Sequence, residues 1–279
     1  MARSKDGLLN RLGQELPEGL LVDAAWLKAR GYSQQLLSHY VSAGWLKQPT
    51  RGVYCRPRGP RSWQQVVVSL QAMLQYPVLV GGRTALEAQG FAHYLVQSIT
   101  EVHLYGPKSP PRWLDKLSLG VSFLHHNDRK LFNHSLPLRG LTHLERKDGG
   151  QDDQSRNKDW VVQGWGEWDW PLALSTPERA ILELLDELPK RESFHQADML
   201  MQGLSNLSPR RLQRLLAECH SVKVKRLFFY FADRHAHAWL KRLDRKAVDL
   251  GEGKRMLVRG GKLDKTDQIT VPGDLDAVQ

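Results

Sequence analysis

Apolar and polar positions alternate at helical spacing in the first part of the chain and predict a series of short helices. The apolar leucines of residues 5–14 predict the first helix. Asp23 is a suitable N-cap for a second helix over AAWLKAR, and Gly31 ends it. Ser33 is the N-cap of a third helix, and Gly44 supplies its stop. The pattern therefore predicts three helices before any strand.

The third helix has two distinct faces. Its apolar face, expected to be buried, consists of Leu36, Leu37, Tyr40 and Val41. Its opposite face is polar and uncharged, and with the cap it consists of Ser33, Gln34, Gln35, Ser38, His39 and Ser42. Such side chains suit hydrogen bonds to base edges, because a glutamine amide can pair with adenine N6 and N7. The spacing of the aromatic residues assigns them to the core: Trp26, Tyr32, Tyr40, Trp45 and Tyr54.

Two strand-like pieces follow the third helix. WLKQ and VYCR flank the turn PTRG, in which Pro49 and Gly52 break the pattern and Arg51 forms the tip. This order predicts a winged helix-turn-helix, whose third helix enters the major groove of DNA while the hairpin, or wing, reaches the backbone. The cations expected on phosphates or in the minor groove are Lys47, Arg51, Arg56 and Arg58. The alternative is a winged helix that docks only to protein.

The middle of the chain predicts strands among helices. After a linker at residues 57–62, WQQVVVSLQAMLQ predicts a helix, and the glycine pair of VLVGGRTALEAQGF predicts a tight turn from strand to helix. Neither G-x-G-x-x-G nor a Walker lysine accompanies these glycines. Strands are expected at 101–106, 119–126 and 134–145, and a surface loop at 146–159. The tryptophans expected to cap the sheet are Trp165, Trp168 and Trp170.

Helix caps dominate the last third of the sequence. Ser175 or Thr176, followed by Pro177, starts STPERAILELLDEL, and further helices are expected from Ser193, from Ser208 and from Ser221. At the end, KRMLVR and DQITVP read as the two sides of a hairpin or β-loop. The predicted fold class is α+β. We expect a winged helix-turn-helix domain at 1–61 and a larger domain at 62–279, with a mixed α/β part at about 62–170 and a helical bundle with a terminal hairpin at about 171–279.

The net charge of +10 is concentrated toward the two ends of the chain. Residues 1–61 hold ten Lys and Arg against four Asp and Glu, and residues 205–262 hold fifteen against five. Clustered positive charge is typical of proteins that bind polyanions, although it also serves solubility alone. A second binding face is expected from the later cluster: Lys223, Lys225, Arg226, Lys241, Arg242, Lys254 and Arg255.

Other functional classes lack a signal in the sequence. No apolar run approaches the ~18 residues of a membrane span, and the start has no apolar signal region, so we expect a cytoplasmic protein without membrane contact. Cys55 and Cys219 form neither a disulfide framework nor a zinc pattern. His235 and His237 would point to different helix faces. Without a catalytic motif we expect no enzyme activity, no metal and no cofactor.

The motifs in their order resemble those of AbiEi-type antitoxins of the type IV toxin–antitoxin class. They are WLKQPTRGVY, VLVGGRTALEAQG, STPERAILELLDEL, VKRLFFYFADR with Trp239 soon after it, and DLGEGKRMLVRGGKLDKTDQITVP. The resemblance covers nearly the whole chain, and the terminal GKR-x-LV-x-GG-x-x-D segment is its most distinctive part.

This resemblance implies a bacterial transcriptional regulator associated with abortive infection against phage. Its N-terminal domain would bind inverted repeats in double-stranded operator DNA and repress its own operon, with each protomer or dimer half reading one repeat. Its C-terminal part would counteract a toxin that resembles a nucleotidyltransferase, without a stable complex. The later basic face would then contact the acidic surface of the toxin, the RNA substrate of the toxin, or more operator DNA. Two alternatives stay open: a docking scaffold, and an enzyme acting on nucleic acid.

Overall fold

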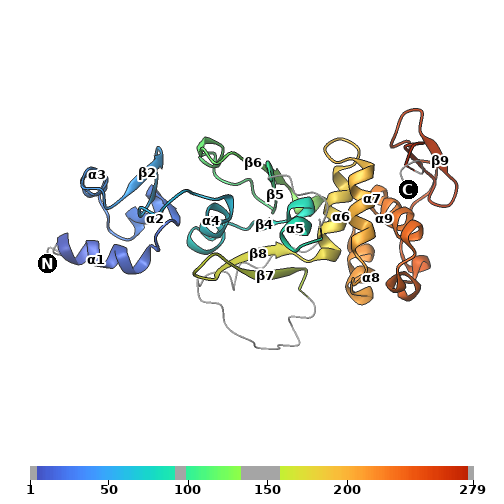
Figure 1. The fold of residues 1–279 in the computed structure, drawn as a ribbon, viewed down its shortest axis with the longest axis horizontal. Helices are drawn as coiled ribbons and strands as arrows, with labels where there is room; N and C mark the ends of the chain where they lie inside the picture. Colours follow the sequence, from blue (N-terminus) through green and yellow to red (C-terminus); the bar gives the residue numbers. More distant parts are fainter. Residues whose placement is uncertain (1–4, 92–98, 133–157, 276–279) are drawn as a thin grey trace.

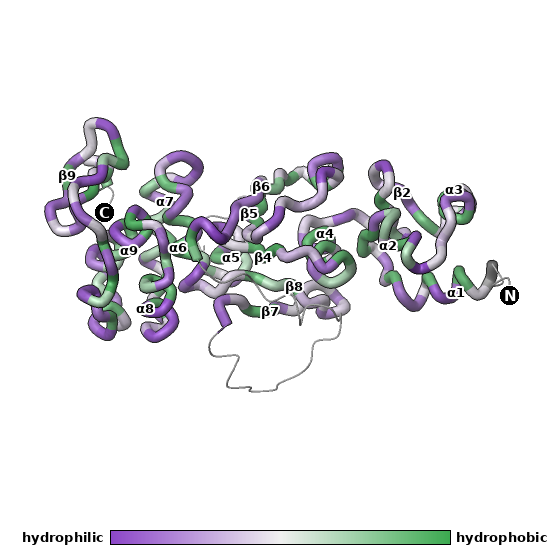
Figure 2. The backbone as a smooth tube through the Cα atoms, turned by 180° about the vertical axis from the view of Figure 1, so that it is seen from behind, coloured by the Kyte–Doolittle hydropathy of each residue, from purple (hydrophilic) through white to green (hydrophobic). Residues whose placement is uncertain are grey.

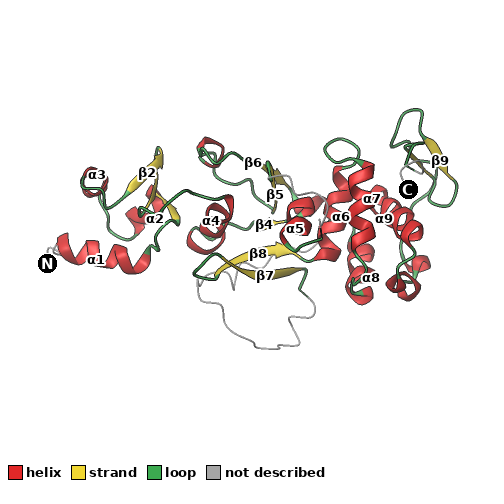
Figure 3. Ribbon diagram, viewed as in Figure 1, coloured by secondary structure: helices red, strands yellow, loops and turns green. Residues whose placement is uncertain are grey.

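The structure is a computed structural model, and it describes residues 5–91, 99–132 and 158–275. The chain has an α+β fold and an elongated shape (Figure 1). The N-terminal elements lie at one end, a mixed sheet lies in the middle, and helices followed by a small hairpin lie at the other end (Figure 1). Figure 3 shows the central strands between helix α4 and the group of later helices.

The N-terminal unit contains the predicted elements in the predicted order. They are α1 (Lys5–Glu15), α2 (Ala24–Ala29), α3 (Gln34–Ser42), β2 (Lys47–Thr50) and β3 (Val53–Cys55). The sequence pattern did not predict β1 (Leu21–Asp23), which pairs with β3 in a three-stranded sheet of order β1-β3-β2. Three residues are too few for an alternating pattern to be recognisable, so only pairing across the sheet defines this strand.

Local capping explains the bounds of α2 and α3. The Asp23 side chain accepts a hydrogen bond from the backbone N–H of Trp26 at 2.8 Å, and Ser33 accepts one from Leu36 at 3.2 Å. Gly44, with φ of 79°, lies just beyond the C-cap of α3. These starts and stops are the predicted ones, because each depends on residues within one helical turn.

Four of the five aromatic residues assigned to the N-terminal core are buried, and Trp45 is the exception. Trp26, Tyr32, Tyr40 and Tyr54 are buried, whereas Trp45 is 55% exposed. The prediction for Trp45 was wrong because the next residue, Leu46, takes the buried position as the chain leaves α3. An exposed tryptophan therefore lies between α3 and the wing.

The interior of the N-terminal unit continues into the rest of the protein. Helix α4 (Trp63–Val68) starts at a capping box formed by Ser62 and Gln65, and the π-helical turn η1 (Ser69–Met73) extends it. The backbone N–H of Leu21 donates to Ser69 Oγ at 2.9 Å. Apolar side chains from both sides of the 57–62 segment belong to one hydrophobic cluster. The proposed boundary at residue 61 thus lies at a change of elements within a continuous core.

The central sheet has five strands in the order β6-β5-β4-β8-β7. They are β4 (Leu79–Val80), β5 (Glu101–Tyr105), β6 (Ser122–His126), β7 (Trp160–Trp165) and β8 (Trp170–Ser175). Strands β5 and β6 are parallel, as are β4 and β8, and the other two pairs are antiparallel. Figure 2 shows hydrophobic colours on β4, in the middle of the sheet.

Two of the three predicted middle strands are confirmed. Strands β5 and β6 fall within 101–106 and 119–126, whereas the strand expected at 134–145 and most of the loop expected at 146–159 lie outside the described residues. Helix α5 (Gly82–Ala88) follows β4 directly. At Gly81 a Cβ atom would overlap the Tyr105 ring and Glu183 Oε2, so the tight turn requires glycine.

The later helices begin at the predicted caps. They are α6 (Pro177–Glu187), α7 (Phe194–Gly203), α8 (Pro209–Glu218) and α9 (Val222–His235), followed by the short helices η5 (Ala238–Arg242) and η6 (Arg245–Ala247). Thr176 is the N-cap of α6, with Pro177 at its first position. Within the described residues, no helix is both long enough and apolar enough to span a bilayer.

The terminal hairpin has a different first strand from the predicted one. Strand β10 (Ile269–Val271) lies in the predicted segment DQITVP, but its partner is β9 (Lys262–Asp264) and not KRMLVR. Arg255 forms only an isolated bridge with Ile269. The glycine pair 260–261 precedes β9. At Gly261 a Cβ atom would overlap the carbonyl oxygen of Val271, so the backbone can approach β10 this closely only at a glycine.

Candidate nucleic-acid interface

The polar face of α3 is exposed as predicted. Gln34, Gln35, Ser38, His39 and Ser42 are all exposed, and Leu37 and Tyr40 are buried on the opposite side. Gln34 Nε2 donates to Tyr54 Oη at 3.5 Å, which turns this amide toward β3. In the described part of the chain, the Gln35 side chain has no hydrogen-bond partner. Gln35 and His39 are therefore the side chains of this face that extend most freely into solvent.

The serines near this face have local partners. Ser33 is occupied as the N-cap of α3, Ser38 Oγ donates to the carbonyl of Gln34 at 3.0 Å, and Ser42 Oγ donates to the carbonyl of His39 at 2.9 Å. A hydroxyl that donates to its own helix can still accept a hydrogen bond from a ligand. Ser33 is exposed like the other serines, although its hydroxyl oxygen already accepts the capping hydrogen bond.

The wing lies next to α3 at the end of the molecule (Figures 1 and 2). Lys47 is exposed at the start of β2, and Arg51 is exposed at the turn, where Gly52 has a φ of 77°. Gln48 Nε2 donates to Tyr54 Oη at 3.3 Å, the same hydroxyl that Gln34 reaches. Tyr54 thus links the first turn of α3 to the base of the wing.

Arg56 and Arg58, which were expected on phosphate, have intramolecular partners. Arg56 Nη1 donates to the carbonyls of Gly13 and Leu16 at 3.1 and 3.2 Å, and its Nη2 donates to Glu18 at 3.0 Å. This arginine closes the end of α1 against the sheet. The sequence prediction treated it as a free cation because its acceptors are about forty residues away and include backbone groups.

Arg58 instead connects the N-terminal unit to the central sheet. Its Nη2 donates to Glu167 Oε2 at 2.8 Å, and its guanidinium lies 4.8 Å from the Trp168 ring centroid and 5.7 Å from that of Trp170. Trp165 and Trp170 lie at the ends of β7 and β8, beside the exposed Trp168. Nothing in the sequence indicated this basic neighbour, because Arg58 precedes Glu167 by 109 residues.

The second predicted basic face does not form as one surface. Lys225 and Arg226 are only 5% and 3% exposed, so their assignment to a binding face was wrong. Lys223 Nζ donates to the carbonyls of Leu188, at 3.0 Å, and of Asp186. Lys241, Arg242, Lys254 and Arg255 are exposed, the first two in η5 and the others before β9. The error arose because α9 is packed inside the bundle and not along its surface.

Arg226 has a structural role that the sequence did not reveal. Its guanidinium donates to four backbone carbonyls: Leu250 at 2.7 Å, Gly253 at 2.6 Å, Gly251 at 2.9 Å and Gln268 at 3.3 Å. A buried cation is tolerated when most of its donors are paired in this way, as four of the five N–H donors are here. Arg226 therefore fixes the segment that leads into the terminal hairpin.

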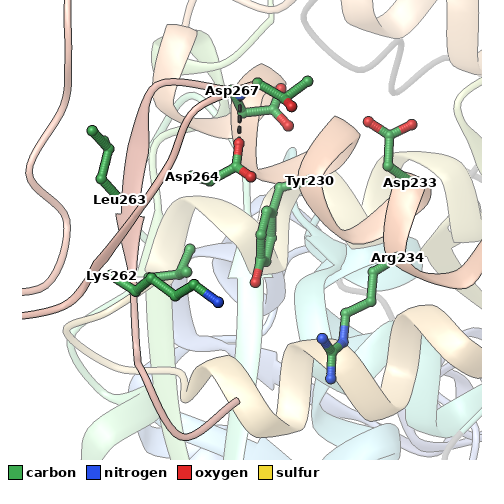
Figure 4. Close-up of a pocket in the computed structure, with 9 residues that line it drawn as sticks. Tyr230, Asp233, Arg234, Lys262, Leu263, Asp264 and Asp267 are labelled. Atoms are coloured by element: carbon green, nitrogen blue, oxygen red, sulfur yellow. Dashed lines mark hydrogen bonds between the residues drawn. The ribbon is translucent and has the colours of Figure 1, made fainter. Parts of the chain in front are cut away.

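A hollow of about 330 Å³ separates α9 from that hairpin (Figure 4). Tyr230, Asp233 and Arg234 of α9 face Asp264 and Asp267 across it (Figure 4). Burial raises the pKa of Asp267 to about 7.

Arg245 bonds to Asp267 and also to Asp233, at 2.7 Å, while the backbone N–H of Asp267 donates to Asp264. Because these charged groups pair with one another, we interpret the hollow as a feature of how the hairpin packs on α9 and not as a binding site. No group of three or more His, Cys, Asp or Glu within the described ranges is placed to hold a metal ion.

A buried chain of ionisable side chains lies between the central sheet and α6. His103 Nδ1 is 3.1 Å from His126 Nε2, and His126 Nδ1 is 2.9 Å from Glu187 Oε1. Burial lowers the pKa of His103 to about 4 and raises that of Glu192 to about 7. Among the described residues, neither carboxyl oxygen of Glu192 has a hydrogen-bond partner, although Arg83 Nε lies 3.4 Å from one of them. Sequence analysis missed this cluster; its only local signal was histidine within two strand patterns.

Sequence comparison assigns the chain to a class and then to a family. Residues 5–97 match the N-terminal domain, and residues 99–272 the main region, of a family described as transcriptional regulator, AbiEi antitoxin, type IV toxin–antitoxin system. The class is thus that of transcriptional regulators. The chain belongs to the AbiEi antitoxin family of type IV toxin–antitoxin systems, which confirms the resemblance noted from its motifs.

Similarity to other known proteins is distant. No curated protein matches the sequence. The crystal structure of the RV2827C protein from Mycobacterium tuberculosis is similar to 94% of this chain and 89% of that one, with a TM-score of 0.53 and 16% sequence identity. At this identity the likeness supports the fold alone.

Proposed function

We propose that this protein represses its own operon by binding inverted repeats in operator DNA through α3 and the wing. The observation that carries the proposal is the exposed, uncharged polar face of α3 beside the two exposed wing cations, Lys47 and Arg51. Gln35 and His39 are positioned to hydrogen-bond base edges in the major groove, with Gln34 and Ser38 at the margin. Arg56 and Arg58 are left out of this set because both have intramolecular partners.

Base reading and phosphate contact can be separated by substitution. Gln35→Ala should cost ~1–3 kcal/mol on the cognate operator and little on scrambled DNA, because only the cognate site offers the paired base. Arg51→Ala should weaken binding to both DNAs and reduce the slope of log K against log salt by about 1. The measurement is fluorescence anisotropy with the protein's own upstream DNA and a scrambled duplex of equal length, over a series of salt concentrations.

Matched controls exist at the other end of the molecule. Gln202 is an exposed helical glutamine at the end of α7, and Arg259 is an exposed arginine before β9. Gln202→Ala and Arg259→Ala should leave the affinity for operator unchanged. Unaltered operator affinity in both Gln35→Ala and Arg51→Ala would refute the interface. Equal, weak, salt-sensitive binding to both duplexes would favour the protein-docking scaffold instead.

The family description also supports an antitoxin role for the part of the chain after residue 61. In this proposal, the larger domain counteracts a nucleotidyltransferase-like toxin without a stable complex, and DNA binding is a separate property. Arg51→Ala should then release repression of an operon reporter while full protection from the co-expressed toxin is retained. Loss of protection in Arg51→Ala, with normal protein levels, would contradict this separation.

A further inference from the structure

A hollow of about 690 Å³ lies at the carboxyl ends of the parallel strands β5 and β6. Its lining includes Tyr105 and His126, the last residues of these strands, and residues 186–191, from the end of α6 into the loop that follows. Met256 and Leu257 complete the lining. This volume is within the range of small-molecule sites, and the carboxyl ends of parallel strands are where sheets of mixed αβ proteins place their ligands. We call it the β6–α6 hollow.

The free charge in the β6–α6 hollow is positive. Its lining includes four cations, Lys130, Lys190, Arg191 and Lys223, and two carboxylates, Asp186 and Glu187. Asp186 lies 3.3 Å from Lys223, and Glu187 lies 2.9 Å from His126 and 3.9 Å from Arg191. Both carboxylates are therefore neutralised by neighbours.

Lys130 and Lys190 remain as charges without internal compensation. Both are exposed, and neither has an ion-pair partner in the part of the chain that the structure describes. Lys130 belongs to the segment after β6 and Lys190 to the loop after α6, so two separate segments of the chain each bring one ammonium group to the lining. Two separate ammonium groups with three donors each suit an anion with several acceptor oxygens and more than one charge.

Part of the remaining lining is apolar, beside the polar side chains of His125 and Asn127. Leu131, Leu188 and Leu257 contribute hydrocarbon surface, and Met256 is 72% exposed although it borders the hollow. The Tyr105 ring stacks on His126 with 4.5 Å between centroids, and His126 is held on both ring nitrogens. Because the Tyr105 and His126 side chains are already held in place by these contacts, less side-chain entropy is lost when a ligand binds against them. The hollow thus combines a cationic part with an uncovered apolar part.

We propose that the β6–α6 hollow binds a small phosphorylated organic molecule, with Lys130 and Lys190 on the phosphate and Met256 and Leu257 against the organic part. A carboxylate offers a single charge and two oxygens, so the lysine pair matches phosphate better. This site is distinct from α3 and the wing, and it does not depend on the proposed binding of operator.

Isothermal titration of the full-length protein tests the site with three probes: ATP, inorganic pyrophosphate and adenosine. ATP and pyrophosphate should bind with dissociation constants of about 1 mM or tighter, and adenosine at least about tenfold more weakly than ATP. Lys130→Ala/Lys190→Ala should weaken pyrophosphate binding by at least about tenfold, whereas Lys241→Ala/Lys246→Ala, an equal loss of exposed charge outside the hollow, should change it less than about twofold. A methyl NMR signal assigned to Met256 should shift on addition of ATP.

Three results would overturn the proposal. The first is no heat of binding and no Met256 shift with either phosphate probe at about 10 mM, where a millimolar site would be mostly filled. The second is equal weakening in the two double variants, which would mean that only overall charge attracts the anion. The third is displacement of pyrophosphate by a short duplex of unrelated sequence, which would assign the hollow to a nucleic-acid surface. Operator affinity of Lys130→Ala/Lys190→Ala, measured in parallel, keeps this test separate from that of the winged unit.

Discussion

Glu192→Gln should make the protein markedly more stable at alkaline pH than the unaltered chain. The Glu192 side chain is buried against Arg83 and His103, and burial raises its pKa from 4.5 to about 7. Arg83 opposes this rise, while the nearby carboxylates Glu87, Glu101 and Glu187 add to it. Glutamine keeps the shape of the side chain and cannot ionise, so it removes the cost of burying a negative charge.

The sign and size of this stability change follow from the difference between the pKa of Glu192 in the folded and in the unfolded state. Since the folded pKa is above the unfolded one, the contribution of Glu192 is fully present below pH 4.5 and is lost as the pH rises through about 7. A rise of about 2.5 pKa units corresponds to a loss of about 3 kcal/mol. His103 acts in the opposite sense: its pKa is lowered from 6.5 to about 4, so its contribution is lost as the pH falls from 6.5 toward 4.

Urea denaturation of both proteins from about pH 5 to about pH 8 measures this effect. Over this range the difference in unfolding free energy, variant minus unaltered chain, should rise with pH by about 2.5 kcal/mol, because part of the effect is already present at about pH 5 and terms common to both proteins cancel. Glu252, an exposed carboxylate before β9, supplies the control: Glu252→Gln should give a difference that is flat with pH. A flat difference for Glu192→Gln as well would refute the assignment of a raised pKa to this buried carboxyl.

Two further substitutions test roles that the structure assigns to arginines. Arg226→Met should destabilise the protein by at least about 3 kcal/mol, because it leaves four carbonyls without their donor. Amide hydrogen exchange should become faster first in residues 251–271. Unchanged exchange in that segment would contradict the role of Arg226. Arg58→Ala should cost about 1 kcal/mol and change the fluorescence of the tryptophans at the β7–β8 turn, while operator affinity stays within about twofold. A tenfold loss of operator affinity in Arg58→Ala would instead indicate that Arg58 contacts phosphate, as the sequence had suggested.

Elements whose signals lie within one helical turn were predictable from the sequence. Asp23, Ser33 and Thr176 each start a helix at the expected residue, since a cap needs only its own side chain or backbone geometry and the next turn. The outward polar face of α3 was equally predictable, because helical periodicity alone fixes which side chains lie opposite Leu37 and Tyr40. The family could likewise be recognised from the order of motifs.

Partners that are distant in sequence were decided only by the tertiary structure. Strand β1 exists through its pairing with β3, and Arg58 meets Glu167 and Trp168 across more than a hundred residues. The buried pairing of His103, His126 and Glu187 depends on the registration of β5 with β6 and on the position of α6. Arg226 shows the physical reason. A cation can be buried only where backbone carbonyls replace its hydrating water, and the carbonyls that do so here lie more than twenty residues away in the sequence, so no local pattern reveals them.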